Sequence, residues 1–339
     1  NLEIKEFNNY LLKKYKSNKI FFDEYMEEAL YSKYGFFSNE KVRSKKSGDF
    51  LTSPEVSEYF GKIINKWIQK SNLDLNITEF GSGTGSLIEQ VENENKFAVE
   101  ISSTARTELS QKNIQIASSL EELTFKNSDL VFGNEVLDNI PCSIAIYKDG
   151  KWQEKIVSFN DGIFSYEFVE ARTKIVEWIE RNRIKADENI DIEIQTNIDI
   201  FLEKIINKLS PKNILFFDYG YEQKDRSKRK YRSLLRTYKD HHLSVDPILE
   251  PGNVDITYDI NFSAVIRKLK TLGYESKLSL QRDFLITNGF DEYFDNLQNK
   301  LLLSEGMENL KINSQLSGLK ALIDSNGLGG FYCLEAKKI

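Results

Sequence analysis

The sequence predicts an α/β protein built on a Rossmann-like, mostly parallel sheet. Residues 76–87 combine a short apolar run that ends in an acid, three glycines at alternate positions and the start of a helical pattern, which predicts a strand, a tight loop and a helix. Further apolar runs at 96–100 and 129–132 are separated by helical patterns, as in βαβ units. Hydrophobic residues make up 40% of the 339 residues, so the chain can bury a full core and still carry insertions.

The glycine loop distinguishes between two kinds of ligand. Gly81, Gly83 and Gly85 follow a G-x-G-x-G pattern, whereas a dinucleotide fingerprint needs a glycine where this chain has Ser86. Glu79 stands just before the loop, where a carboxylate would repel phosphates but could hold an ammonium group. This combination favours S-adenosylmethionine, which carries an amino group and a sulfonium cation. The alternative is a glycine-rich turn that binds no ligand.

A second acid supports the cofactor interpretation. The apolar run that begins at Lys96 reads as the next strand, and it ends in Glu100. In nucleotide-binding βαβ units an acid at the end of the second strand accepts hydrogen bonds from ribose hydroxyls. We therefore predict that Glu100 binds the ribose, and the alternative is a solvated carboxylate at the end of a strand.

Residues 1–70 precede this unit and have helical periodicity. Thr52 and Glu55 have capping-box spacing at the start of a predicted long helix, with Pro54 in its first turn. This segment is either a well-capped helix start and nothing more, or a lid over the cofactor that uses Asp49 and Thr52, and spacing alone does not separate the two. Two apolar stripes predict buried helix faces: Phe22, Tyr25, Met26, Ala29 and Leu30, then Val56, Tyr59, Phe60, Ile63, Ile64 and Trp67.

The remaining chain completes the sheet and adds insertions. Alternating residues from 143 to 169, with Asp-Gly turns, predict β-hairpins outside the parallel sheet. The stretch 222–260 begins basic and ends acidic, and it reads as a long charged loop. We thus expect four regions: a helical cap and lid at 1–70, the cofactor-binding half of the core at 71–142, a hairpin and helical insertion at 143–190, and the second half of the core at 191–339.

Composition argues against several function classes. A formal net charge of −6 argues against general nucleic-acid binding, which needs a basic surface. No apolar run approaches the ~20 residues that span a bilayer, and no signal-peptide pattern opens the sequence, so we expect no membrane insertion and a cytoplasmic location. The two cysteines are far apart and the only two histidines are adjacent, so we expect no metal site. Composition does not predict the oligomeric state.

These motifs resemble, in the same order and over nearly the whole chain, the MidA-like family of S-adenosylmethionine-dependent methyltransferases. The glycine loop is shared by many methyltransferases, whereas the stretches 48–55 and 134–138 are much more specific. One departure is Ser82 and Thr84, where the family often has proline or arginine. Other shared motifs are Tyr25-Met26, Ala29-Leu30-Tyr31, Tyr34-Gly35-Phe36-Phe37, Val99-Glu100, Asp218-Tyr219-Gly220-Tyr221, Asp246-Pro247, Pro251-Gly252 and Asp255-Ile256-Thr257.

The resemblance implies a seven-stranded class I methyltransferase sheet with an N-terminal helical cap, and S-adenosylmethionine as the cofactor. It implies a protein substrate methylated on arginine, because the family includes a mitochondrial protein arginine methyltransferase that assists assembly of respiratory complex I. It also favours the lid interpretation of Asp49 and Thr52. If the source is eukaryotic, the mitochondrial matrix is the alternative to the cytoplasm.

Arginine chemistry suggests roles for the polar residues that follow the strand at 129–132. A guanidinium stays protonated in proteins and is a poor nucleophile, so a carboxylate that pairs with it would orient one nitrogen and favour loss of its proton. We predict Glu135 for this role and Asn134 as a second positioning group through its amide oxygen. Asp138 would support them if a helical turn begins there, and capping of the next element is its alternative.

Two other function classes are possible. An assembly or scaffolding protein could keep the cofactor pocket and act only by binding a partner, and the charged stretch and the hairpins offer surface for this. A nicotinamide-dependent oxidoreductase is disfavoured by Ser86 and Glu79.

Overall fold

The computed structural model describes residues 2–38, 51–71, 76–83, 85–93, 95–112, 114–124, 126–229, 235–239, 242–243 and 246–339. The chain divides into two compact units, which are described separately. The first unit contains residues 1–49, 137–202 and 221–265, and the second unit contains residues 50–136, 203–220 and 266–339. Helices α7 (Thr196–Leu209) and α8 (Phe262–Thr271) continue from one unit into the other.

The second unit is built on a seven-stranded sheet in the order β16-β17-β10-β5-β2-β3-β4. The strands from β10 to β4 pair in parallel, and β17 runs antiparallel to both β10 and β16. This arrangement confirms the predicted fold class. The strands are β2 (Ile77–Phe80), β3 (Lys96–Val99), β4 (Gln115–Ala117), β5 (Leu130–Asn134), β10 (Asn213–Asp218), β16 (Tyr274–Leu280) and β17 (Tyr332–Lys338).

The strand order places the glycine loop and Asn134 at the same edge of this sheet. Strands β2 and β5 are neighbours, although β3 and β4 lie between them in the chain. Open α/β sheets bind ligands beyond the carboxyl ends of neighbouring strands whose connections leave in opposite directions, as those of β2 and β5 do. The loop follows β2, and Asn134 is the last residue of β5.

Helices of the second unit pack on the sheet and form its apolar core. Phe60 of α4 meets Phe217 of β10 edge to face, with ring centroids 5.0 Å apart. The predicted stripe on α4 is buried with them. The helices and 3₁₀ turns of this unit are α3 (Ser53–Val56), α4 (Tyr59–Lys70), η3 (Ile88–Gln90), α5 (Ser103–Leu109), η4 (Leu120–Glu122), α9 (Gln281–Thr287), α10 (Phe290–Leu302), α11 (Gly306–Ile323) and η7 (Leu328–Gly330).

Two predicted helices were wrong in extent. The long helix expected after the capping box is interrupted at Ser57, whose extended backbone ends α3 and whose hydroxyl accepts the Tyr59 N–H at 3.2 Å, so α4 begins anew. After the glycine loop the expected helix is only the 3₁₀ turn η3. There, Asn65 Oδ1 accepts the Glu92 N–H at 3.0 Å and takes that backbone group out of any helical ladder.

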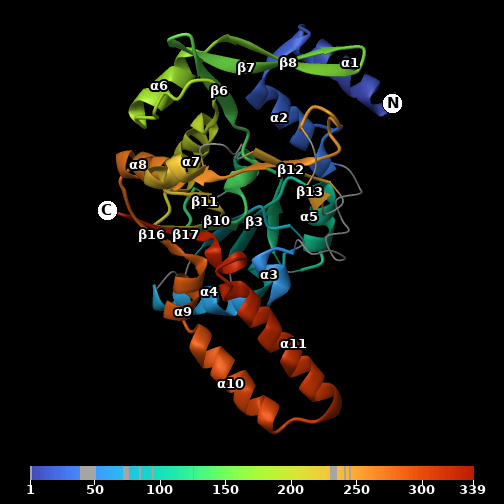
Figure 1. Ribbon diagram of the computed structural model, residues 1–339. Coiled ribbons are helices and arrows are strands. Elements are labelled where there is room, and N and C mark those ends of the chain that lie inside the picture. The colour runs from blue at the N-terminus through green and yellow to red at the C-terminus, as the bar shows by residue number, and fades with distance from the viewer. Residues whose placement is uncertain are drawn as a thin grey trace. The chain divides into compact units, whose positions relative to one another are not determined.

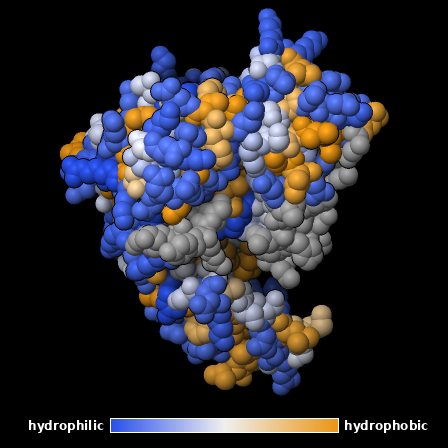
Figure 2. Space-filling view, turned by 45° about the horizontal axis from the view of Figure 1, so that its top comes forward, coloured by the Kyte–Doolittle hydropathy of each residue, from blue (hydrophilic) through white to orange (hydrophobic). Residues whose placement is uncertain are grey.

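Helices α10 and α11 form a hairpin that extends away from the sheet (Figure 1). Its end carries four apolar side chains with exposed fractions from 65% to 90%, and Figure 2 shows apolar surface at the lower end of the view. No helix in the described part of the chain is long and apolar enough to cross a bilayer. The four exposed side chains are Leu302, Leu303, Met307 and Leu310.

The first unit contains a five-stranded antiparallel sheet in the order β1-β7-β6-β9, and β8 also pairs with β7. This sheet confirms the predicted hairpins outside the parallel sheet, and β1 and β9 are strands that the sequence analysis missed. The elements are α1 (Leu2–Tyr15), β1 (Lys19–Phe21), α2 (Phe22–Tyr31), η1 (Phe36–Ser38), β6 (Ser143–Lys148), β7 (Lys151–Asn160), β8 (Ile163–Glu170), α6 (Thr173–Arg181) and β9 (Asp191–Ile194).

The stretch 222–260, predicted as a long loop, contains regular structure where it is described. Strands β12, β13 and β14 form a three-stranded antiparallel sheet in the order β13-β12-β14. The loop prediction failed because the charges hide the alternating pattern of these short strands. The elements not yet named are η5 (Leu137–Asn139), β11 (Gly220–Tyr221), η6 (Gln223–Arg229), β12 (Leu235–Lys239), β13 (His242–Leu243), β14 (Asp255–Tyr258) and β15 (Ile260–Asn261).

Arg172 joins α2 to β7 in the first unit. Its Nη2 atom donates to Asp23 Oδ1 at 2.8 Å and to Glu154 Oε2 at 2.5 Å, and both carboxylates are buried. The guanidinium carbon also lies 3.7 Å from the centroid of the Phe21 ring. The Arg172 guanidinium therefore compensates the buried Glu154 and, together with Lys174 Nζ at 3.6 Å from Asp23 Oδ2, the buried Asp23, and it holds α2 to the antiparallel sheet.

Replacing Arg172 with methionine would remove the cation that pairs with Glu154 and leave Asp23 with the longer ion pair to Lys174. We expect Arg172→Met to lower the free energy of unfolding by about 3–5 kcal/mol, measured by urea denaturation at pH 7. Lys148→Met, at an exposed hairpin position, is the control and should change it by less than about 0.5 kcal/mol. Equal effects of the two substitutions would contradict this assignment.

Candidate functional site

The loop after β2 needs glycine for two different reasons. Gly81, Gly83 and Gly85 all have positive φ, at +66°, +56° and +93°. A β-carbon at Gly81 or Gly85 would lie 2.7 Å from a neighbouring side chain, so these two glycines allow the loop to pack. Among the residues that the structure describes, a β-carbon at Gly83 would meet nothing within 4 Å. Gly83 is thus the point of the loop where a ligand can approach the backbone.

Glu100 is joined to this loop directly. Its Oε1 atom accepts the Gly83 N–H at 2.7 Å, and its Oε2 atom accepts the Ser102 N–H at 2.9 Å. The residue is only 8% exposed. A carboxylate has about four lone-pair positions, so each oxygen keeps the capacity to accept a hydroxyl. The structure therefore brings Glu100 and the glycine loop together, as the ribose prediction requires.

Glu79 lies on β2 at the same edge and is almost completely buried, with 2% of its surface exposed. Burial raises the pKa of its carboxyl to about 8, a hydrogen bond with Ser82 opposes this shift, and the charge of Glu100 adds to it. Among the described residues, its Oε1 atom has no hydrogen-bond partner. A buried acceptor of this kind favours a cationic donor, because only a cation makes the ionised form stable there.

Asn134 and Glu135 follow at the end of the neighbouring strand β5. The Asn134 Nδ2 atom donates to Glu135 Oε2 at 3.4 Å, while its buried Oδ1 atom has no partner in the described part of the chain. Glu135 has a φ of +52°, a left-handed conformation that costs a non-glycine residue roughly 1–2 kcal/mol. Its N–H donates to Phe217 O on β10 at 2.8 Å, which helps hold this geometry. Strained residues of this kind are concentrated at functional sites.

The other three predicted residues are placed differently. Asp138 is buried in the first unit on the 3₁₀ turn η5, which begins at Leu137, so Glu135 is not part of that turn and the condition for a shared helical face is not met. Thr52 forms the predicted capping box, with its N–H and hydroxyl both donating to Glu55 Oε1. Asp49 lies outside the described residues.

The sequence analysis missed Ser102. Its N–H donates to Glu100, and its hydroxyl accepts the Ala105 N–H at 3.3 Å and so caps α5. A serine two residues after a strand-end acid, directly before a helical pattern, is an N-cap signal that could have found it.

The residues of the second unit fit S-adenosylmethionine. A ligand bound at the carboxyl ends of β2 and β3 would need a donor or a cation for Glu79 and hydroxyl groups for Glu100, and it would lie against the open backbone at Gly83. The cofactor has an ammonium group and ribose hydroxyls. No group of three potential metal ligands occurs among the described residues.

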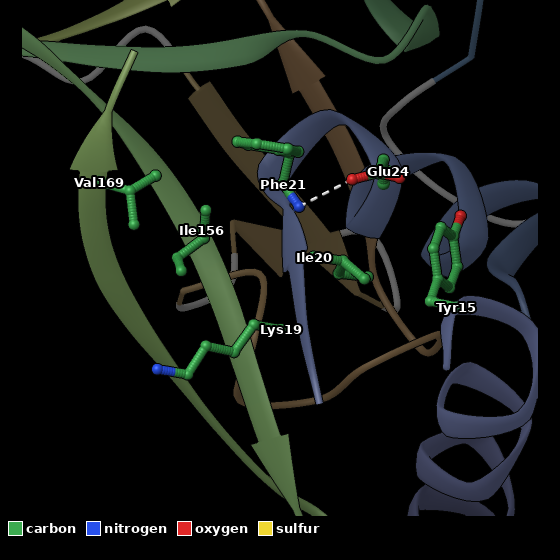
Figure 3. Close-up of a pocket in the computed structure, with 7 residues that line it drawn as sticks. All are labelled: Tyr15, Lys19, Ile20, Phe21, Glu24, Ile156 and Val169. Carbon is green, nitrogen blue, oxygen red and sulfur yellow. Dashed lines mark hydrogen bonds between the residues drawn. The ribbon is translucent and has the colours of Figure 1, made fainter. Parts of the chain in front are cut away.

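The first unit has a pocket of its own, which contains none of the predicted site residues (Figure 3). Figure 3 shows it between β1, β7 and β8, with the Glu24 carboxylate turned toward the Phe21 N–H, which it accepts at 3.0 Å. This bond completes the capping box of α2, so Glu24 has a structural role. The lining residues are Tyr15, Lys19, Ile20, Phe21, Glu24, Ile156 and Val169.

Comparison with known proteins agrees with this site. The family described as "Putative S-adenosyl-L-methionine-dependent methyltransferase" matches residues 59–278, which is more than half of the chain. This range includes the glycine loop, Glu100 and Glu135.

Curated relatives and solved structures are similar over most of the chain. "Protein arginine methyltransferase NDUFAF7 homolog, mitochondrial" from Drosophila melanogaster is 26% identical, over 74% of this chain and 66% of its own length. "Protein arginine methyltransferase NDUFAF7, mitochondrial" from Xenopus tropicalis is 22% identical, over 95% of this chain and 83% of its own. A Burkholderia thailandensis protein titled a "likely methyl transferase", bound to S-adenosyl-homocysteine, is 22% identical with a TM-score of 0.82, over 99% of this chain and 93% of its own, which shows the fold.

The raised pKa of Glu79 makes cofactor binding release a proton. At pH 7 a carboxyl with a pKa of about 8 is mostly protonated, and an ammonium guest favours its ionised form. We expect S-adenosylhomocysteine to release roughly one proton from the wild-type protein at pH 7, measured by calorimetry in buffers of different ionisation enthalpy. Glu79→Gln should bind more weakly and release none. Equal proton release by both proteins would show that Glu79 does not face the ligand.

A side chain at position 83 should occupy the space that the cofactor needs. We expect Gly83→Val to abolish binding of S-adenosylhomocysteine in calorimetry. Gly273→Val is a matched control in the same unit, because Gly273 has a φ of +89° and equally open space. Both variants carry a similar backbone strain of about 1–2 kcal/mol, so only the local effect on the ligand differs. Retained binding by Gly83→Val would place the cofactor elsewhere.

Proposed function

Because this chain belongs to the family of S-adenosyl-L-methionine-dependent methyltransferases, we propose that it methylates arginine side chains of a protein. The methyltransferase activity and the cofactor follow from the family. The protein substrate and the arginine are the proposal, and two observations support them. The relatives from Drosophila melanogaster and Xenopus tropicalis are named protein arginine methyltransferases. In this chain, Glu135, an acid with a strained left-handed backbone, follows β5 directly.

Four residues of the second unit would hold the cofactor. Glu79 would bind the ammonium end as an ion pair, Glu100 would accept ribose hydroxyls, and the backbone at Gly83 would lie against the ligand. When bound, S-adenosyl-L-methionine supplies an electrophilic methyl group on a positively charged sulfur. Gly81 would keep the loop in its bent conformation. The roles of Asp49 and Thr52 in a lid are proposed on the family resemblance alone.

Glu135 is the residue that carries the proposed substrate chemistry. A carboxylate that accepts two guanidinium N–H bonds fixes the plane of the group and stabilises the positive charge that builds up as the nitrogen takes the methyl group. It can then accept the proton that the methylated nitrogen loses. Asn134 would add a neutral acceptor through its Oδ1 atom, which the described residues leave without a partner. The contact between Asn134 Nδ2 and Glu135 would keep both side chains in a fixed relation.

Transfer of labelled methyl groups tests the proposal. The protein is incubated with methyl-labelled cofactor and a cell lysate, and mass spectrometry identifies the modified residue. We expect labelled arginine, and at least about a 100-fold lower rate for Glu135→Gln with unchanged S-adenosylhomocysteine binding, because only the substrate carboxylate is lost. Glu121→Gln, an exposed acid in the same unit, is the control and should retain the wild-type rate.

Three outcomes would contradict the proposal in different ways. Label on another residue type would exclude arginine as the substrate. Full activity of Glu135→Gln would remove Glu135 from the reaction. Binding of the cofactor without any transfer would favour an assembly protein that keeps the pocket but acts by binding a partner, for which the exposed apolar end of the α10–α11 hairpin offers surface.

The location of the protein stays a prediction. The relatives are named as mitochondrial proteins, which agrees with a mitochondrial matrix location if the source is eukaryotic, and cytoplasmic location is the other expectation.

A further inference from the structure

A second pocket of the first unit is lined by the turn after α6, the start of β9 and the first residues of η6. Its volume is about 200 Å³. Three isoleucines form its apolar part, at positions 184, 190 and 192. Four cations also line it, and we call it the basic pocket: Arg183, Lys185, Lys224 and Arg226. Asp187 is the one acid among its described lining residues.

The two lysines of the basic pocket have only weak partners. Lys185 Nζ lies 3.5 Å from Asp187 Oδ1, and Lys224 Nζ lies 3.3 Å from Glu222 Oε2. Both lysine side chains are more than 70% exposed, at 79% and 74%. Ion pairs between exposed side chains contribute little to stability, because water solvates both partners well. Either lysine can therefore turn to another anion at little cost.

The two arginines keep donors for a ligand. Arg226 Nη2 lies 3.5 Å from the backbone oxygen of Asp191 and 3.9 Å from Glu193 Oε2. Charge-assisted hydrogen bonds are usually about 2.7–2.9 Å long, so both contacts leave donor capacity in a group with five N–H bonds. Arg183 has no ion pair within the described ranges of the chain. A cleft lined by such cations attracts anions.

Gln223 joins the two sides of the basic pocket. Its Nε2 atom donates to the backbone oxygen of Asn182 at 2.7 Å, and its own N–H donates to Ser263 Oγ at 2.9 Å. The turn η6, which carries Lys224 and Arg226, is therefore fixed to the turn after α6. These two segments are held together before any ligand binds, which lowers the entropic cost of binding.

The size and lining of the pocket restrict the ligand. Pockets for drug-sized molecules measure roughly 300–1,000 Å³, so a pocket of about 200 Å³ suits a single small group. Guanidinium groups pair best with carboxylates and phosphates. A bare inorganic anion would leave the isoleucines unused, so the ligand should carry an aliphatic group beside its charge. The last residue of a protein chain can offer both, because its free carboxylate and its side chain share one Cα atom.

We infer that the basic pocket binds the C-terminal residue of a partner protein, with the free carboxylate on the cations and an aliphatic side chain against the isoleucines. Capture of a terminal carboxylate is a recurring mode of peptide recognition. The inference goes beyond the proposed function and does not depend on it, because this binding requires neither the cofactor nor an arginine in the partner.

Binding of short peptides to the full chain tests the inference. The main probe is acetyl-Gly-Gly-Leu with a free carboxylate, titrated by saturation-transfer NMR. The comparison probes are its C-terminal amide, acetyl-Gly-Gly-Gly with a free carboxylate, and acetyl-Gly-Glu-Gly-amide, which carries an internal acid. We expect the main probe to bind at least fivefold more tightly than each of the other three.

Two variants assign this binding to the pocket. We expect Arg183→Asn and Lys224→Gln each to weaken binding of the main probe at least threefold. Arg183 has a φ of +50°, which asparagine tolerates, so Arg183→Asn preserves the fold. Lys16→Asn is the matched control, because Lys16 is an exposed cation of the same unit that also follows a helix, with a φ of +53°. It should bind the probe as the wild type does.

Three outcomes would overturn the inference, and none of them affects the proposed function. Equal binding of the free acid and the amide would show that the carboxylate is not recognised. Equal binding of the internal glutamate peptide would exclude a preference for a chain terminus. Unchanged binding by both Arg183→Asn and Lys224→Gln would place the peptide elsewhere on the protein. All variants should retain wild-type affinity for S-adenosylhomocysteine, which confirms that they are folded.

Discussion

The buried carboxylate of Glu79 is the constraint on which the site in the second unit depends. A carboxylate taken out of water is stable as an anion only beside a cation, and otherwise it keeps its proton, which is why burial raises its pKa to about 8. Strand β2 cannot release it, because β3 and β5 pair with both edges of that strand. The sheet therefore holds a carboxylate whose Oε1 atom has no hydrogen-bond partner in the described part of the chain, and a ligand with a positive end would stabilise it there.

Other buried acids in this protein show the contrast. Asp23 and Glu154 are also buried, but the Arg172 guanidinium pairs with both and Lys174 pairs with Asp23 as well, and their role is to hold the first unit together. A buried acid with its own cation is structural. A buried acid without one is a candidate for binding a cationic ligand.

Local patterns in the sequence predicted the cofactor loop well. Alternating glycines between an apolar run and a helical pattern, with acids at two strand ends, determine a loop whose geometry depends on few distant residues. Gly83 and Glu100 accordingly meet in the structure. The buried stripe on α2 was predicted for the same reason, because helical spacing is a local property. The interruption at Ser57 was missed, since its hydroxyl competes with the helix that its neighbours favour.

By itself the sequence determined the fold class, the glycine loop and the acids Glu79 and Glu100 at β2 and β3. These features depend on hydrophobic periodicity, turn chemistry and residue type within short segments. Only the tertiary structure decided which acids are buried without a cation and which polar residues share a face. Strand β14 shows why. Thr257 and Asp255 acquire their neighbours through pairing with β12, and that register depends on residues far apart in the chain.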